Sequence, residues 1–137
     1  MKVGGILETA LYVADPARSA GFYRGLFGFG VLLESDRLIA LEVAGRDVLL
    51  LFRAGSTDGP FHAPGGTIPV HGGSGRGHFA FSIDAGDVPA WRERLEGGPG
   101  LAGEVAWPGG AVSLYFRDPD GHLGELITPG FWALGAV

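Results

Sequence analysis

The stretch Leu7-Glu8-Thr9-Ala10-Leu11-Tyr12-Val13 opens a plan that this chain follows twice. The second copy opens with His78-Phe79-Ala80-Phe81-Ser82-Ile83. Side chains in both stretches alternate between two faces with the period of two that is typical of a β-strand. A helix-like segment and further strands follow each copy, ending in Val48-Leu49-Leu50-Leu51-Phe52 and in Leu123-Gly124-Glu125-Leu126-Ile127. We therefore predict an α+β fold of two tandem β-α-β-β-β modules.

The first module is expected over about residues 6–54. Its strands are predicted at residues 6–13, 30–35, 37–43 and 46–53. Asp15-Pro16 is a typical helix start, because Asp caps the free N–H groups and proline suits the first helical position. Gly28 is a suitable residue to end that helix. The turn Ala44-Gly45-Arg46-Asp47 then separates the last two strands.

The second module is expected over about residues 78–129. A strand at 78–83 precedes a helix near 87–96, which Asp87 is predicted to cap. Strands follow at 103–107, 111–117 and 122–128. Asp118-Pro119-Asp120-Gly121 predicts a tight turn, since proline favours the second turn position and glycine the last.

The segment between the modules, about residues 55–77, is rich in Gly, Pro, Ser and His. A connection of this length inside a small domain is usually a functional lid or a mobile segment. We expect residues 1–137 to form a single domain in which this linker acts as a lid.

The composition excludes several classes of protein. The net charge is −5, so no excess of basic residues is available to neutralise nucleic-acid phosphates. No apolar run approaches the roughly 20 residues of a membrane span, and the N-terminus does not resemble a signal peptide. The chain has no cysteine, which removes disulfides and thiolate chemistry and fits a cytoplasmic location.

Ligand-type side chains occur at corresponding positions of the two copies. Aligning strand with strand places Glu8 opposite His78 and Leu50 opposite Glu125. Three of these four residues can bind a metal, although they lie within apolar strands where an unpaired charge is costly. On the strand from residue 78, His78 shares its face with Ala80 and Ser82, which are small and suit the lining of a cavity.

Glu8, His78 and Glu125 therefore form a candidate metal site. One imidazole and two carboxylates suit Fe, Mn, Ni, Co or Zn better than Ca or Mg, which prefer shells made only of oxygen. Three protein ligands also leave positions for water or substrate. Each residue has an ordinary structural alternative: His78 as a hydrogen-bonded strand residue, Glu8 in solvent, and Glu125 paired with Arg117 or Arg53.

Two further histidines have different expected roles. His71 lies in the stretch Pro69-Val70-His71-Gly72-Gly73, from which it could reach a cavity as a proton shuttle or substrate contact. Its alternative is a surface loop histidine. His122 lies in the turn before the last strand and is expected to be solvated.

Three stretches resemble the vicinal oxygen chelate superfamily, which includes glyoxalase I, bleomycin-resistance proteins, fosfomycin-resistance enzymes and extradiol dioxygenases. They are Asp15-Pro16 with Ser19, Phe22-Tyr23 and Gly28-Phe29, then Gly77-His78-Phe79-Ala80-Phe81, and finally Phe116-Arg117-Asp118-Pro119-Asp120-Gly121-His122-Leu123-Gly124-Glu125-Leu126. The resemblance covers nearly the whole chain. It implies paired modules that form a cupped mixed sheet around a metal, usually in a homodimer.

The resemblance places His78 and Glu125 at the superfamily's metal positions. Glu8 matches a third position at which His or Gln is usual. Glyoxalase I has a metal-binding, proton-moving Glu where this chain has Leu50, so a typical glyoxalase I is not expected. The resemblance implies a divalent-metal-dependent enzyme, either a lyase/isomerase or a dioxygenase, acting on a small oxygen-chelating substrate. The alternative is a metal-free protein that binds and sequesters an antibiotic-like small molecule.

Roles for the site residues follow from these expectations. Glu8, Glu125 and His71 are the candidate catalytic residues. The candidate substrate pocket consists of Tyr12, Leu50, Phe52, Tyr115 and Arg117. Arg117 would neutralise an anionic substrate or pair with Glu125. The expected partners are a small-molecule substrate and a second copy of the chain.

Overall fold

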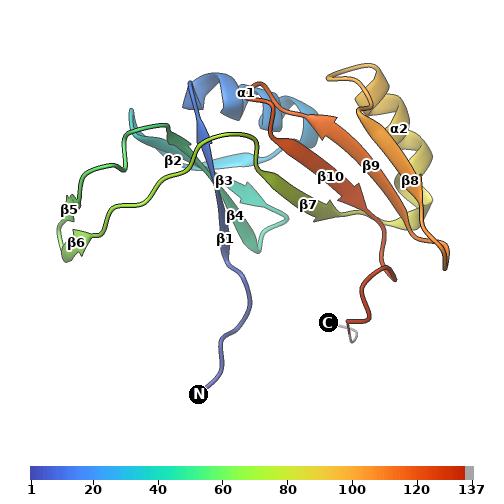
Figure 1. Cartoon of the computed structure of the whole chain (residues 1–137), viewed down its shortest axis with the longest axis horizontal. Helices are drawn as coiled ribbons and strands as arrows, with labels where there is room; N and C mark the ends of the chain where they lie inside the picture. The colour runs from blue at the N-terminus through green and yellow to red at the C-terminus, as the bar shows by residue number, and fades with distance from the viewer. Residues whose placement is uncertain (135–137) are drawn as a thin grey trace. The chain divides into compact units, whose positions relative to one another are not determined.

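The β-α-β-β-β order occurs twice, once in each of two structural units. A computed structural model describes residues 1–134. Its first unit covers Met1–Gly75, and its second unit begins at Arg76. Each unit has a mixed four-stranded sheet and its own helix, which confirms the α+β class (Figure 1). In the described part of the chain, no helix is long and apolar enough to cross a membrane.

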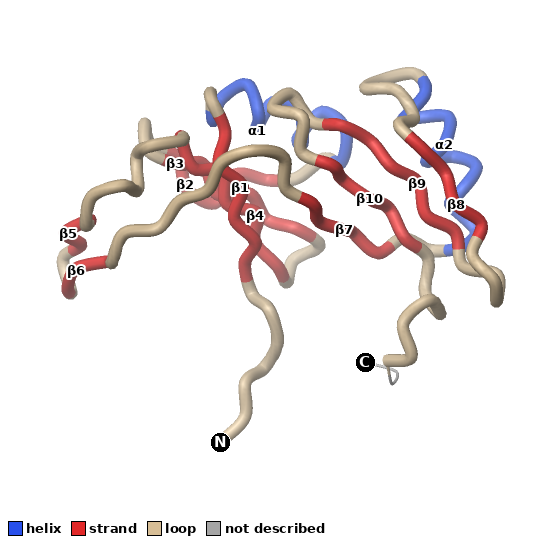
Figure 2. Tube along the Cα trace, viewed as in Figure 1, coloured by secondary structure: helices blue, strands red, loops and turns tan. Residues whose placement is uncertain are grey.

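The first unit contains one four-stranded sheet, one helix and one small hairpin. In chain order its elements are β1 (Glu8–Val13), α1 (Pro16–Phe27), β2 (Gly30–Glu34), β3 (Leu38–Val43), β4 (Asp47–Arg53), β5 (Phe61–Ala63) and β6 (Gly66–Ile68). The strand order is β1-β4-β3-β2, with β1 and β4 parallel and the other pairs antiparallel. Strands β5 and β6 pair with each other and project from this sheet (Figure 2).

Helix α1 has the predicted ends. The Asp15 side chain accepts hydrogen bonds from the N–H groups of Ala17 and Arg18, at 3.0 and 3.3 Å. Gly28 has a φ of 75°, a left-handed conformation that costs glycine little, and its N–H donates to the carbonyl of Arg24 at 2.8 Å. These end groups satisfy backbone atoms that the helix itself leaves without partners.

The core of the first unit lies between α1 and one face of the sheet. Tyr23 on the helix is fully buried, as are Leu41 on β3 and Leu49 and Leu51 on β4. Burying a leucine side chain contributes about 2 kcal/mol relative to leaving it in water. The opposite face of the same strands has a second set of side chains, in which Phe52 packs with Leu38 and Ala40.

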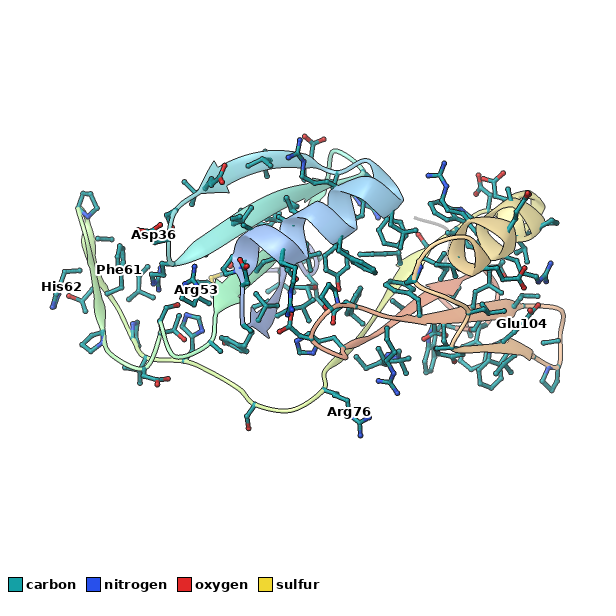
Figure 3. All side chains as sticks on the ribbon, turned by 90° about the horizontal axis from the view of Figure 1, so that it is seen from above. Asp36, Arg53, Phe61, His62, Arg76 and Glu104 are labelled. Carbon is teal, nitrogen blue, oxygen red and sulfur yellow. The ribbon has the colours of Figure 1, made fainter. Side chains whose placement is uncertain are left out.

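The second unit repeats the plan without the hairpin. Its elements are β7 (His78–Ser82), the 3-10 turn η1 (Ala85–Asp87), α2 (Val88–Glu96), β8 (Gly103–Ala106), β9 (Val112–Arg117) and β10 (Leu123–Ile127). The strand order is β7-β10-β9-β8, with β7 and β10 parallel. Arg92 on α2 donates from Nε to Glu104 on β8 at 2.9 Å, which joins the helix to the outer strand (Figure 3).

The start of α2 differs from the prediction. Asp87 has helical backbone angles, and its side chain makes no capping hydrogen bond. The prediction failed because η1 precedes α2 directly, so Asp87 is already inside a turn when the helix begins. A capping side chain needs an extended backbone at its own position.

The turn before β10 has the predicted form and an additional anchor. Asp118 Oδ1 accepts from the N–H groups of Asp120 and His122, each at 2.9 Å. The expectation that His122 is solvated was wrong, because it is only 4% exposed. Its Nδ1 accepts from the N–H of Gly77 at 2.8 Å, which fixes the chain one residue before His78.

The two parallel strand pairs have the same register. Glu8 pairs with Val48 and Ala10 with Leu50 across β1 and β4, whereas His78 pairs with Leu123 and Ala80 with Glu125 across β7 and β10. Positions that pair in the same way in each unit are called register equivalents below. Glu8 is therefore the register equivalent of His78, and Leu50 that of Glu125, as the sequence alignment predicted.

Candidate metal centre

His78 and Glu125 form the centre of the candidate site. Nε2 of His78 lies 3.2 Å from Oε2 of Glu125, although the residues come from different strands, β7 and β10. The Glu125 side chain is 10% exposed and that of His78 is 52% exposed. The pair is thus a nearly buried carboxylate beside an imidazole that solvent can reach.

The tautomer of His78 follows from its second contact. Nδ1 of His78 lies 2.9 Å from the carbonyl oxygen of Leu123, which can only accept, so Nδ1 has the proton and donates. In the neutral imidazole Nε2 then has a lone pair, and it faces a carboxylate oxygen. Two acceptors at this distance need something positive between them: a proton on Nε2, or a cation that both atoms bind.

These donor atoms fit a divalent transition metal. An imidazole whose other nitrogen donates to a backbone carbonyl is the usual form of a metal-binding histidine, because that bond fixes the ring and raises its basicity. The Glu125 side chain is likewise held in place by a hydrogen bond. Its Oε1 accepts from the Ser113 hydroxyl at 2.6 Å, and its Oε2 faces His78. Imidazole nitrogen with carboxylate oxygen suits Fe, Mn, Co, Ni or Zn.

Tyr115 lies on the same face of this sheet. It is the direct partner of Glu125 across β9 and β10, and its ring centroid is 6.4 Å from that of His78. Burial raises the pKa of the Tyr115 phenol, and the charge of Glu125 raises it further, although a hydrogen bond with Ser113 acts in the opposite direction. Tyr115 therefore keeps its proton at neutral pH and can donate it to an acceptor.

Arg117 does not take the pairing role considered for it. Its Nη1 donates to the backbone carbonyl of Gly121 at 3.0 Å, within the turn before β10. Arg53, the other alternative, donates to the carbonyls of Asp36 and Ala14 in the first unit (Figure 3). The side chains that face the Glu125 carboxylate include those of His78 and Ser113.

A second cluster lies in the first unit and brings together four predicted residues. The hydroxyl of Tyr12 lies 2.6 Å from Nδ1 of His71. The imidazole of His71 also meets the Phe52 ring edge-on, with ring centroids 4.9 Å apart, and Phe52 stacks with Tyr12 at 6.0 Å. Leu50 packs against the core group that includes Phe52. His71 is therefore held by ring contacts rather than exposed on a loop.

Glu8 is the exposed first residue of β1 and belongs to the first unit. Its strand places it beside Val48. Within residues 1–134, no group of three or more His, Asp or Glu side chains is spaced to hold a metal. The His78–Glu125 pair brings together two atoms of a type that can bind a metal.

The sequence prediction missed two residues of this site. Ser113 and Trp107 take part in hydrogen bonds that lead to Glu125. Ser113 was recognisable by parity, because it alternates with Leu114 on a strand whose other face is apolar. No sequence pattern identified Trp107, because it lies beyond the end of β8 and its hydrogen-bond partner Ser113 is six residues away.

The duplicated unit and the His–Glu pair on neighbouring strands define the class of protein that the sequence resembled, the vicinal oxygen chelate proteins. The model of the Glyoxalase/Bleomycin resistance protein/Dioxygenase superfamily matches residues 5–126, and the chain belongs to that superfamily.

The individual relatives are named for different functions. The chain is 45% identical over 129 residues to a metallothiol transferase FosB of Bacillus licheniformis, covering 93% of this chain and 77% of that protein. It also resembles the crystal structure of a lactoylglutathione lyase from Agrobacterium tumefaciens, with a TM-score of 0.88, 33% identity and coverage of 98% and 100%. An oxidase, ChaP-H2, shares the fold at 22% identity and a TM-score of 0.67, covering 98% of this chain and 100% of that one.

Proposed function

We propose that this chain is a divalent-metal-dependent enzyme that transfers a thiol to a small substrate able to chelate the metal through oxygen atoms. The observation that supports a metal is the contact between His78 and Glu125. Nε2 of His78 and Oε2 of Glu125, both acceptors, face each other at 3.2 Å, and separate hydrogen bonds fix the orientation of each side chain. Glu8 is proposed as the third ligand because it is the register equivalent of His78.

The choice of thiol transfer over the other reaction classes rests on two points. The relative that covers 93% of the chain is a metallothiol transferase. In addition, Leu50 stands where the glyoxalase I pattern has a proton-moving Glu, and a hydrocarbon side chain cannot move a proton. A thiol that attacks as its thiolate does not need a base at that position.

The chain's own groups have defined parts in this proposal. His78 and Glu125 would hold the metal, which when bound supplies Lewis acidity that stabilises negative charge on a substrate oxygen. Tyr115 keeps its proton and offers a hydrogen bond beside the pair. Leu50, Phe52 and the ring of Tyr12 would contact the carbon skeleton of the substrate, and Arg117 would contact an anionic group. His71 is retained as a candidate for proton movement together with Tyr12.

The metal is tested by elemental analysis and by calorimetric titration with Mn²⁺, Co²⁺, Ni²⁺, Zn²⁺ and anaerobic Fe²⁺. We expect stoichiometric binding that is lost in Glu125→Ala and His78→Ala and retained in Glu34→Ala, which removes an exposed strand carboxylate outside the site. If metal binding is lost in these two variants but not in Glu8→Ala, the His78–Glu125 site is supported and Glu8 is excluded as its third ligand. No binding by the unmodified chain would favour the metal-free binding protein.

The reaction is tested on the metal-loaded protein with three substrate classes. Thiol consumption with small epoxides supports thiol transfer, and turnover of α-keto thiol adducts supports the lyase/isomerase class. Oxygen uptake with catechols supports the dioxygenase class. Either of the last two results, without thiol consumption, would overturn the proposed reaction.

A further inference from the structure

Three side chains form a hydrogen-bonded series that ends on the candidate metal ligand Glu125. The indole Nε1 of Trp107 donates to Oγ of Ser113 at 2.8 Å, and the Ser113 hydroxyl donates to Oε1 of Glu125 at 2.6 Å. Ser113 is fully buried on β9, and Trp107 is half-buried just beyond β8. The series therefore crosses the second sheet from its edge towards β10.

The direction of this series is fixed by chemistry. An indole N–H can only donate, so the Ser113 oxygen must accept from Trp107. While the Tyr115 phenol is neutral, the one hydroxyl proton of Ser113 is directed to Oε1 of Glu125. Oε1 thereby faces Ser113, and Oε2 is the carboxylate oxygen that faces Nε2 of His78, at 3.2 Å.

The first unit indicates that these polar groups are not needed for the fold. The register equivalents of Ser113, Tyr115 and Glu125 are Leu38, Ala40 and Leu50. The same strand order forms there with an apolar set, in which Leu38 and Ala40 are buried. A buried hydroxyl and a buried carboxylate cost free energy unless each finds a partner, so a purely structural requirement would favour the apolar set.

We propose that Ser113 and Trp107 are positioning residues that hold the Glu125 carboxylate in one orientation, so that Oε2 alone joins Nε2 of His78 in binding a divalent transition metal. The inference rests on the proposed function, because it concerns how one of its metal ligands is oriented. Neither residue touches the metal or the substrate in this proposal.

This proposal predicts that replacing Ser113 lowers the metal affinity more than replacing Trp107. Ser113→Ala takes away the hydrogen bond from the Ser113 hydroxyl to Oε1 and lets the carboxylate rotate more freely. Losing a hydrogen bond behind a metal ligand typically lowers metal affinity by about 10- to 100-fold. Trp107→Phe keeps the ring that packs on Phe131, with centroids 4.5 Å apart, but loses the N–H. Its effect should be smaller, because Ser113 can still donate.

The experiment measures Co²⁺ affinity by calorimetry and the visible absorption of bound Co²⁺ for the full-length protein and four variants. Ser113→Ala should lower the affinity about 10-fold or more and alter the Co²⁺ spectrum. Ser113→Thr, which keeps the hydroxyl, should recover most of the affinity. Trp107→Phe should have an intermediate effect. Trp132→Phe, which changes a side chain that is 68% exposed, is the matched control and should behave as the unmodified protein.

The outcomes separate the two proposals. If the unmodified chain binds no metal, the proposed function fails and the positioning role with it. If it binds metal with unchanged affinity and spectrum in both Ser113→Ala and Trp107→Phe, the proposed function stands and the positioning role is overturned. If Ser113→Ala does not fold, the affinity and spectrum of Trp107→Phe decide the matter.

Discussion

Leu50 is the register equivalent of Glu125: each lies opposite an alanine, Ala10 or Ala80, across the parallel strand pair of its own unit. One backbone arrangement therefore has a hydrocarbon at this position in the first unit and a carboxylate in the second. The carboxylate has Ser113 and His78 as partners, whereas Leu50 packs with Phe52 and its neighbours. At this position the second unit therefore has a polar group with partners, and the first unit has an apolar one.

Glyoxalase I activity should be negligible. Leu50 cannot bind a metal or accept a proton, so the metal-loaded protein is expected not to isomerise the adduct of methylglyoxal and glutathione at a measurable rate. The measurement is a spectrophotometric thioester assay with each divalent metal. Robust turnover would mean that another base operates, and His71→Ala and Glu8→Ala would then be the first variants to assay.

Residues 55–77 should be the first part of the chain that a protease cuts. The N–H of His71 donates to the carbonyl of Thr57 at 3.1 Å, and the Thr57 hydroxyl donates to the carbonyl of His71. We call these two bonds the Thr57–His71 clamp. Cuts should fall between its two residues, in the segment that contains the hairpin β5–β6, and a bound ligand should slow them if this segment is a lid.

Limited proteolysis with mass spectrometry checks this lid prediction. Thr57→Val removes one bond of the clamp and should accelerate cutting, whereas Thr9→Val, at an exposed position of β1 outside the segment, should have little effect. Equal cutting with and without every ligand that binds would identify the segment as a passive linker.

A homodimer is expected in solution. Strand β2 is an edge of its sheet, all five of its residues are exposed, and Val31, Leu32 and Leu33 are consecutive apolar residues among them. Exposed apolar edges of this kind usually pair with or are covered by another chain. Light scattering at micromolar concentration should give twice the mass of the chain, and a monomeric mass would contradict this.

Mixed dimers test whether Glu8 completes the site of a second copy. A Glu8→Ala chain and a Glu125→Ala chain each lack a proposed ligand. If the sites are shared across a two-fold axis, co-refolding the two should restore metal binding at one site per mixed dimer. If each site is built within one chain, the mixture should bind no more metal than the separate variants.

Gly124→Ala should destabilise the second unit strongly. Gly124 pairs with Phe116 across β10 and β9, and a Cβ at Gly124 would lie 2.1 Å from Cζ of that ring. Phe116 is fully buried, so the ring has little room to move and the loss should reach or exceed the usual 1–3 kcal/mol of overpacking. Chemical denaturation measures it. Gly21→Ala is the control, since nothing lies within 4 Å of that position and alanine favours a helix.

The contact between α2 and β8 should weaken in acid. Hydrogen bonding to Arg92 lowers the pKa of Glu104 below its usual value. Because the folded-state pKa is the lower one, the stabilisation is complete above the unfolded pKa of about 4.3 and is lost as the pH falls through the folded value. Glu104→Gln should therefore be less stable than the unmodified protein at pH 7 but not in strong acid. A difference that persists in acid would contradict an ionic origin.

The fold could be predicted from sequence because its signals are local and repeated. The alternation of Phe79 and Phe81 with His78 and Ala80, the Asp15-Pro16 start and the Asp118–Gly121 turn each depend on neighbouring residues. The register equivalence of Glu8 and His78 also followed from strand parity.

The environment of the site could not be predicted in the same way. The bond from Trp107 to Ser113 needs a strand register that only the folded sheet defines. The burial of His122 depends on the N–H of Gly77, 45 residues earlier in the chain. The contact between Tyr12 and His71 likewise joins residues 59 apart. Each of these depends on tertiary structure, which composition and spacing do not define.

The Thr57–His71 clamp has a consequence for how this protein can change over evolutionary time. It joins the two ends of the segment that contains the hairpin β5–β6. The residues between Thr57 and His71 can therefore become more or fewer, or be replaced, without a change in the four-stranded sheet. The entropy cost of a longer closed loop rises only slowly with its length. Homologues are therefore expected to vary most in length and sequence between these two residues. A designer who wants a different substrate preference can begin by replacing the segment between Thr57 and His71.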